Sequence, residues 1–286
     1  MYFKKAGDGM KKRFIVLFLA VLSVLSYSVF YFITSHVNQA EKVTQLTKAA
    51  PIPVQPQDMQ IVALGDSLTE GVGDVTEKGG YIPYLQTFLE GEEDIKTVQI
   101  DNFGVKGSRS DQLLQKVQTV EVQAAIKESD MVIITIGGND MMKVVRENIT
   151  NLTKNDFLMQ RELFKENLSS IIEVIRNEND NIHIVLVGLY NPFHKWFPEI
   201  KEMNEVVNEW NESSQEILGQ YPDTYFVGIM ELFENVEEEL LYTDYFHPNN
   251  RGYEVIAGKV YEELEKDVIE QVVEQKWLVQ KQEEFN

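Results

Sequence analysis

The stretch IVALGDSLTEGVG, residues 61–73, joins a short apolar run to Gly-Asp-Ser-Leu and then to a glycine-rich turn. An apolar run of this length that ends at glycine is typical of a buried β-strand. Ser67 would then stand just beyond the end of that strand. A serine there can cap a helix, bind phosphate or act as a nucleophile, and the rest of the sequence has to distinguish these roles.

Apolar, strand-like runs recur along the chain and alternate with segments of helical periodicity. The predicted strands cover 59–64, 95–104, 131–138, 182–190 and 224–229, and the predicted helices cover 81–90, 111–128, 156–177, 199–218 and 251–277. Apolar strands that alternate with helices predict an α/β domain over residues 59–286, with a parallel sheet covered on both faces. Ligands of such domains bind beyond the carboxyl ends of the strands.

The composition excludes several classes of function. The formal net charge is −20, which argues against a nucleic-acid partner because phosphate binding needs a basic surface. The chain has no cysteine, so disulfides, thiolate nucleophiles and cysteine-ligated zinc are excluded.

The amino-terminal region has the pattern of a membrane anchor. Residues 1–13 are basic, and the segment 14–34 that follows begins with an uncharged apolar run from Phe14 to Ile33. A helix of about 20 residues spans about 30 Å, the thickness of a bilayer core. The basic flank predicts a cytoplasmic segment 1–13, a transmembrane anchor or uncleaved signal at 14–34 and an outward-facing remainder. The alternative is a cleaved signal peptide and a secreted product. Residues 35–58, which contain three prolines, are predicted to be a linker.

Two further predicted strands deliver glycine and short polar residues to the same edge of the sheet as Ser67. The second strand leads into NFGVKGSRS, residues 102–110, and the third leads into GGND, residues 137–140. We therefore expect the segments to converge on one site. The segments 73–81, 141–156 and 191–200 are predicted to be the loops that decide substrate choice.

A nucleophilic serine needs a base, and the chain contains four histidines. His36 lies beside the predicted anchor, and His183 lies inside a predicted buried strand, as a core residue would. His194 lies in an aromatic-rich segment, where it either contacts substrate or packs. His247 follows Asp244 by three residues in a turn-like segment, so Asp244 can hold one ring nitrogen and leave the other for the serine.

Taken together, four blocks of this sequence resemble those of the SGNH, or GDSL, hydrolases, in the family's order. They are GDSLTEG at 65–71, NFGVKG at 102–107, GGND at 137–140 and DYFHP at 244–248. The resemblance covers residues 59–260. It implies a flavodoxin-like three-layer α/β/α sandwich with a five-stranded parallel sheet, serine esterase or lipase activity, and no metal or cofactor.

The resemblance also implies roles for individual residues. Ser67 corresponds to the family's nucleophile, and Asp244 and His247 correspond to the other members of the triad. The oxyanion hole would consist of the Ser67 N–H, the Gly107 N–H and the Asn139 side-chain amide.

One assignment within these blocks stays open, and two of their residues have no catalytic role in the family. Gly104 competes with Gly107 for the place in the oxyanion hole, and the distance from Asn102 favours Gly107. Asp66 and Asp140 have no catalytic role in the family, so a structural role is expected for both.

The predicted function is therefore hydrolysis of small acyl esters or lipid esters at the outer membrane surface, through an acyl-enzyme. An O-acetyl esterase that acts on cell-wall glycan is an alternative substrate class. A non-catalytic surface-binding module on the same fold is the alternative from another functional class. A phosphate-binding domain is disfavoured, because the chain lacks both G-x-G-x-x-G and the P-loop lysine motif.

Overall fold

Five parallel strands form the centre of the protein, for which a computed structural model describes residues 55–192, 202–234 and 237–284. The strands are β1 (Gln57–Gly65), β2 (Ile95–Gly104), β3 (Met131–Thr135), β4 (His183–Val187) and β5 (Thr224–Val227). Their order in the sheet is β2-β1-β3-β4-β5, and every neighbouring pair is parallel. This is the flavodoxin-like order, so the predicted five-stranded parallel sheet is confirmed.

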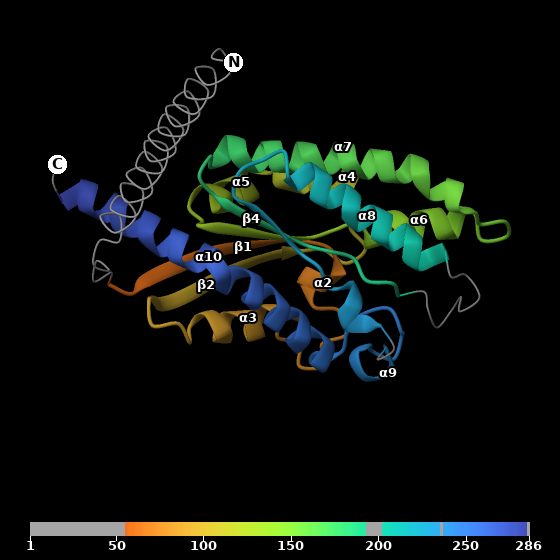
Figure 1. The fold of residues 1–286 in the computed structure, drawn as a ribbon, viewed down its shortest axis with the longest axis horizontal. Coiled ribbons are helices and arrows are strands. Elements are labelled where there is room, and N and C mark those ends of the chain that lie inside the picture. Colours follow the sequence, from red (N-terminus) through yellow and green to blue (C-terminus); the bar gives the residue numbers. More distant parts are fainter. Residues whose placement is uncertain (1–54, 193–201, 235–236, 285–286) are drawn as a thin grey trace, which may run out of the picture. The chain divides into compact units, whose positions relative to one another are not determined.

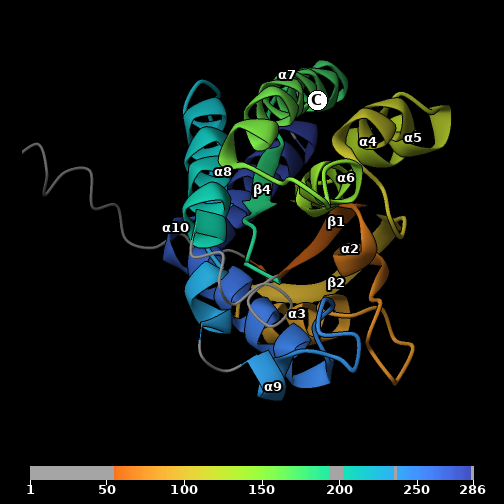
Figure 2. The same cartoon turned by 90° about the vertical axis from the view of Figure 1, so that its right-hand side faces the viewer.

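Helices cover both faces of the sheet, which gives the three predicted layers (Figures 1 and 2). One side carries α4 (Ser110–Val117), α5 (Val120–Lys127), α6 (Gly138–Glu147), α7 (Lys154–Glu178) and α8 (Glu202–Leu218). The other side carries α3 (Ile82–Leu89) and α10 (Asn250–Glu284). Short helices α2 (Ser67–Glu70), η1 (Met230–Phe233) and α9 (Glu237–Leu240) complete the described elements.

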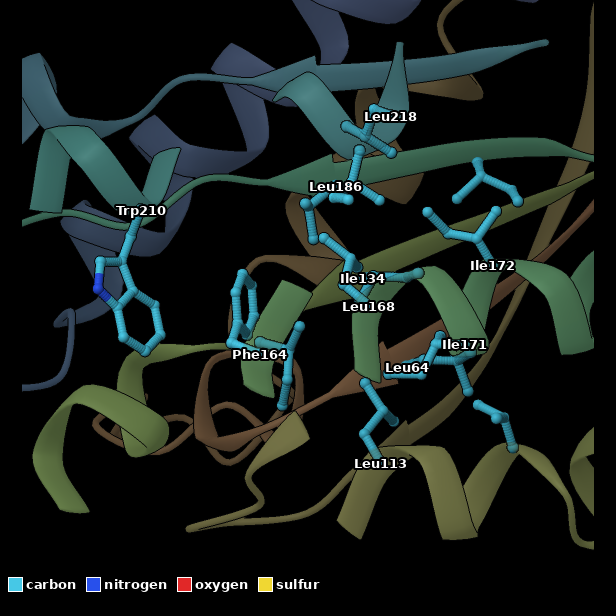
Figure 3. Packing of buried hydrophobic residues seen from close by; sticks show 14 of the residues in the cluster. Leu64, Leu113, Ile134, Phe164, Leu168, Ile171, Ile172, Leu186, Trp210 and Leu218 are labelled. Carbon is cyan, nitrogen blue, oxygen red and sulfur yellow. The ribbon is translucent and has the colours of Figure 1, made fainter. Parts of the chain in front are cut away.

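The three central strands β1, β3 and β4 are buried on both faces, and alternate residues pack into different layers. Leu64, Ile134 and Leu186 lie on three neighbouring strands and point toward α4 and α7 (Figure 3). There they meet a cluster that includes Leu113, Leu168, Ile171 and Ile172, with the rings of Phe164 and Trp210 stacked at one end. Continuous apolar strands are what a parallel sheet between two helical layers requires.

The topology leaves a switch point between β1 and β3. The chain leaves β1 toward α3 on one face and leaves β3 toward α6 and α7 on the other, so the two loops diverge at the carboxyl edge (Figure 2). Gly65 at the end of β1 pairs with Thr135 at the end of β3. Ligand sites of doubly wound sheets lie at this position, which here is flanked by Ser67 and Asn139.

Several predicted boundaries are wrong, among them the end of the strand 182–190, which is Val187, and the end of the helix 251–277, which continues to Glu284. The predicted helix 111–128 is two helices, because Thr119 is extended and its hydroxyl bonds to the Lys116 carbonyl at 2.8 Å. The predicted strand 131–138 ends at Thr135, since Gly137 has a φ of 114° and is the N-cap residue of α6. The predicted loop 141–156 is helical to Glu147.

The predicted segments 1–13 and 14–34, and nearly all of the predicted linker 35–58, lie outside the described residues. Strand β1 begins at Gln57, two residues before the predicted domain boundary. Within the described ranges, no helix combines the length and apolarity needed to cross a bilayer.

Candidate active site

Ser67 is the first residue of α2, directly after the end of β1. The end of β1 approaches β3 closely at Gly65, where only glycine fits, because a Cβ at this position would lie 2.1 Å from the Thr135 carbonyl oxygen. Asp66 caps the helix, since its Oδ1 accepts from the Leu68 N–H at 3.1 Å and from the Thr135 hydroxyl at 3.0 Å. The sharp turn from strand to helix therefore holds Ser67 in a fixed place, with only 2% of its surface exposed.

The structure brings Ser67, His247 and Asp244 together in one line of hydrogen bonds. His247 Nε2 lies 3.0 Å from Ser67 Oγ, and His247 Nδ1 lies 2.7 Å from Asp244 Oδ2. The other carboxylate oxygen of Asp244 accepts from the backbone N–H groups of Phe246 and His247, both at 3.0 Å. Both heavy-atom distances along the line are within the reach required for proton transfer.

Hydrogen bonds keep Asp244 ionised in spite of its partial burial. Burial acts to raise the pKa of this carboxyl, but the bonds from the His247 ring and from the two backbone N–H groups outweigh it and lower the pKa below its ordinary value. An ionised Asp244 can fix the tautomer of His247 and stabilise the imidazolium form.

Three candidate donors, at the start of α2, on the segment after β2 and on α6, lack a complete set of acceptors. In the part of the chain that the structure describes, neither the Ser67 N–H nor the Gly107 N–H donates to a protein acceptor. Asn139 Nδ2 donates to the Ser108 carbonyl at 3.0 Å, which leaves one of its two hydrogens for another acceptor. These are the three donors that the sequence predicts for an oxyanion hole.

The two candidate glycines are placed very differently. The Gly104 N–H already donates to Asn102 Oδ1 at 2.9 Å, and a Cβ on Gly104 would lie 2.2 Å from the Glu70 backbone nitrogen. Gly107 has a φ of 81° and open space where a Cβ would be. Close packing against α2 thus explains glycine at 104, and the unused N–H at 107 favours Gly107 as the donor.

A small, largely apolar cavity of about 30 Å³ opens beside Ser67. Its walls include Leu68, Ile136, Met141, Val187, Leu189, Tyr190 and Phe246. Asn211 of α8 fixes one wall, because its side chain bonds both the N–H and the carbonyl of Leu189, at 2.8 and 2.9 Å. An apolar hollow next to a serine and an amide donor can hold the hydrocarbon part of an ester.

Tyr190 is a site residue that the sequence interpretation missed. It lies just beyond the end of β4, lines the cavity and donates its hydroxyl to the Phe246 carbonyl, next to His247. Its ring stacks on Phe233 with the centroids 4.1 Å apart. The same argument that selected the ends of the first three strands, applied to the fourth, would have pointed to this residue.

The other histidines lie away from this line of bonds or outside the described residues. His183 is buried in β4 and stacks on Tyr225, and burial lowers its pKa, as the prediction of a core residue requires. His36 and His194 are not among the described residues. The described ranges also contain no group of three His, Asp or Glu side chains arranged to hold a metal ion.

Two buried carboxyl groups, Asp66 and Asp140, lie beneath the site. Burial, together with the charge of Asp140, raises the pKa of Asp66 to about 7, against the effect of its hydrogen bonds from Leu68 and Thr135. Burial also raises the pKa of Asp140, against the effect of its bonds from Ser110.

Comparison with known proteins agrees with this geometry. Residues 63–255 match the sequence model of the GDSL-like Lipase/Acylhydrolase family. The chain is 39% identical over 209 residues to Uncharacterized protein YpmR of Bacillus subtilis strain 168, which covers 72% of this chain and 82% of that protein. It is 28% identical over 207 residues to Spore germination lipase LipC of Bacillus licheniformis, covering 71% of this chain and 94% of that protein.

Solved structures share the fold. The lipase Lip_vut3 from a goat rumen metagenome superposes with a TM-score of 0.65 at 26% identity, over 72% of this chain and 97% of that chain. The family 3 carbohydrate esterase of Clostridium thermocellum has the same fold, with a TM-score of 0.55 at 19% identity, over 76% of this chain and 100% of that chain.

Proposed function

This chain belongs to the GDSL-like lipase/acylhydrolase family, and we propose that it hydrolyses carboxylic esters through an acyl-enzyme intermediate on Ser67. The observation that carries the proposal is the line of bonds from Ser67 Oγ through His247 to Asp244, at 3.0 and 2.7 Å. A serine hydroxyl is a weak nucleophile until a base accepts its proton, and His247 Nε2 is in place to do so.

Attack begins when Ser67 Oγ adds to the ester carbonyl carbon and its proton passes to His247 Nε2. Asp244 stabilises the imidazolium that forms, because its ionised carboxylate accepts a hydrogen bond from the Nδ1–H group, which keeps its proton. The carbonyl oxygen becomes negative in the tetrahedral intermediate, and the N–H groups of Ser67 and Gly107 and the free Asn139 amide hydrogen donate to it. Loss of one such donor typically lowers kcat by about 10²–10³-fold.

Collapse of this intermediate breaks the bond to the alcohol oxygen, which takes the proton from His247 Nε2 and leaves. Water then occupies the place of the alcohol, loses a proton to His247 and attacks the acyl group on Ser67. The second tetrahedral intermediate releases the acid and returns the proton to Ser67.

The cavity beside Ser67 favours a short acyl group. With about 30 Å³ it offers room for about one or two groups the size of a water molecule. An O-acetyl ester is therefore a second candidate substrate, beside a lipid or lysolipid ester whose chain would extend out of the cavity. The relative that is named a spore germination lipase supports an acyl-ester substrate in general.

We also propose that the enzyme acts outside the cell, held to the membrane by residues 14–34. The uncharged run after a basic segment supports an anchor, and a secreted product is the alternative. Fractionation of cells that express the full chain, or a chain without residues 14–34, tests this. The anchor predicts that only the full chain sediments with membranes.

The activity is tested by hydrolysis of p-nitrophenyl esters from acetyl to palmitoyl, with the full-length chain and its Ser67→Ala variant. Ser129→Ala is the matched control, since Ser129 is a buried serine that bonds to the Ile126 carbonyl, away from the site. We expect the control to retain wild-type turnover and Ser67→Ala to lose it. If the wild type hydrolyses no ester and a fluorophosphonate does not label Ser67, the catalytic proposal is wrong and a surface-binding module takes its place.

A further inference from the structure

The backbone segment that carries Gly107 is held from two sides. On one side, the Val105 N–H donates to the Gly65 carbonyl at 3.0 Å, and the Lys106 N–H donates to the Glu70 carboxylate. These bonds connect the segment to the strand end and the short helix that carry Ser67. Gly107 itself follows them and makes no such bond among the described residues.

On the other side, two consecutive residues of α6 hold the segment just after Gly107. Asn139 Nδ2 donates to the Ser108 carbonyl at 3.0 Å. Asp140 accepts the Ser110 N–H on Oδ2 at 2.9 Å and the Ser110 hydroxyl on Oδ1 at 2.6 Å. One helical turn therefore fixes both the Asn139 amide and the backbone that follows Gly107.

The contacts of Asp140 form a closed network. Asp140 is fully buried, and Gln160 of α7 donates to its Oδ1 at 3.3 Å. Asn167, also of α7, donates to the Ser110 hydroxyl oxygen at 3.0 Å. A buried carboxylate is costly unless several donors satisfy it, and a satisfied network of this kind fixes the positions of its members.

Asp140 contacts none of the three residues of the proton-transfer line in the described structure. In the described ranges its hydrogen-bond partners are Ser110 and Gln160, whereas His247 and Asp244 belong to the segment that precedes α10. The hydrogen bonds of Asp140 therefore lead to the segment that carries Gly107, and not to the base.

We infer that Asp140 is a positioning residue, which sets the Gly107 N–H against the Asn139 amide by holding Ser110. The inference rests on the proposed function. Oxyanion donors act only within about 2.7–3.1 Å of the developing charge, and a misplacement of about 1 Å can cost about 100-fold in rate. Removal of the carboxylate would release Ser110 and let Gly107 move away from Asn139.

The test compares graded variants in the full-length chain by steady-state hydrolysis of p-nitrophenyl acetate. Asp140→Ala removes both acceptors and is expected to lower kcat about 100-fold with little change in KM. Asp140→Asn keeps one acceptor oxygen and is expected to lower kcat about 10-fold. Ser110→Ala removes only the hydroxyl, so it should lower kcat less than Asp140→Ala does. In the double variant it should cause no further fall in kcat beyond that of Asp140→Ala. The pH profile of kcat should stay that of the wild type in all of them.

Asp130→Asn is the matched control, because Asp130 also accepts a backbone N–H, from Gln60 at 2.8 Å, but lies at the opposite edge of the sheet beside Lys276. This variant should lower the melting temperature and leave kcat unchanged. If Asp140 has a purely structural role, Asp140→Asn will behave like Asp130→Asn, with a lower melting temperature and an unchanged kcat per folded molecule. That result would overturn the inference. If Asp140→Ala does not fold, Asp140→Asn and Ser110→Ala decide in the same way.

The two proposals fail differently. A wild-type chain that neither hydrolyses esters nor reacts with a fluorophosphonate refutes the proposed function, and the inference falls with it. A wild-type chain that is active, with folded Asp140 and Ser110 variants of equal kcat, refutes only the inference.

Discussion

His247 Nε2 lies 3.0 Å from Ser67 Oγ, although 180 positions separate the two residues in the chain. Their meeting depends on the loop before α10, in which Asp244 binds the His247 ring and two backbone N–H groups at once. The Asp244 carboxylate therefore has two roles: it fixes the shape of the loop and it orients the His247 ring.

Replacement of Asp244 by Asn should separate these two roles. The amide still accepts backbone N–H groups but carries no charge to stabilise an imidazolium, so we expect kcat to fall by about 10³–10⁴-fold with little change in KM. The side chain is 41% exposed, and the melting temperature should hardly change. Asp58→Asn, an exposed aspartate bonded to Thr97, serves as the control and should keep full activity. Equal activity of both variants would remove Asp244 from the mechanism.

Alanine at the two candidate glycines should give opposite results. The Cβ of Gly107→Ala would find open space, but the φ of 81° is unfavourable for alanine and should strain the backbone by about 1–2 kcal/mol. We therefore expect a clear fall in kcat and only a small fall in the melting temperature. Gly104→Ala would place its Cβ 2.2 Å from the Glu70 nitrogen and should lower the melting temperature by several degrees, as roughly 2–4 °C follows from each kcal/mol. A stable Gly104→Ala protein without activity, beside an active Gly107→Ala protein, would exchange the two assignments.

The convergence of the site residues could be predicted from the sequence, because the carboxyl ends of parallel strands meet at one edge. That argument needs only the strands and the polar residues that follow them, and it placed Ser67, Gly107 and Asn139 at a common edge. His247 required one more step, the spacing of three from Asp244.

The supports of the site could not be predicted in this way. The bonds from the Ser110 N–H to Asp140 and from the Leu189 N–H to Asn211 join segments whose packing depends on the angles between whole helices. The break between α4 and α5 was also hidden, since apolar residues keep helical spacing across it while Thr119 is extended.

Tyr190→Phe should weaken catalysis without disturbing the core. The variant keeps the stack on Phe233 but loses the bond from the hydroxyl to the Phe246 carbonyl, beside His247. A neutral hydrogen bond contributes about 1 kcal/mol, so we expect kcat to fall about 5-fold. Tyr225→Phe loses a hydroxyl bonded to Gln271, near His183, and should keep its kcat. Unchanged kcat in Tyr190→Phe would mean that the His247 loop holds its shape without this bond.

Leu189→Ala should shift the preference for acyl chain length. The backbone of Leu189 is held by Asn211, so the change should widen the cavity and leave its wall in place. One methylene in an apolar pocket discriminates by about 10-fold or more, and the ratio of kcat/KM for butyryl over acetyl esters should rise by about that factor. Leu158→Ala, a change at an exposed leucine of α7, should leave the ratio as it is. If both variants keep the wild-type ratio, this cavity does not hold the acyl group.

Asp66→Asn should stabilise the protein at neutral and alkaline pH, and the pH dependence of the effect follows from the buried carboxyl. The native pKa of Asp66 is raised to about 7 from the ordinary 3.8, so between these values the native state binds more protons than the unfolded state. The stability of the wild type therefore falls as pH rises through this window, and the loss is complete above pH 7. Each pKa unit corresponds to about 1.4 kcal/mol, which sets an upper limit of about 4 kcal/mol.

The asparagine variant has no such proton, while its side-chain oxygen still accepts the Leu68 N–H and the Thr135 hydroxyl that cap and support α2. The difference in melting temperature between variant and wild type should be small at pH 4, grow to about 10 °C near pH 7 and stay constant at higher pH. Thermal unfolding of both proteins at matched pH values measures this difference, and all other titrating groups cancel in it. A difference that does not change with pH would show that Asp66 is ionised in the native state throughout the range, with its charge fully balanced by the two donors.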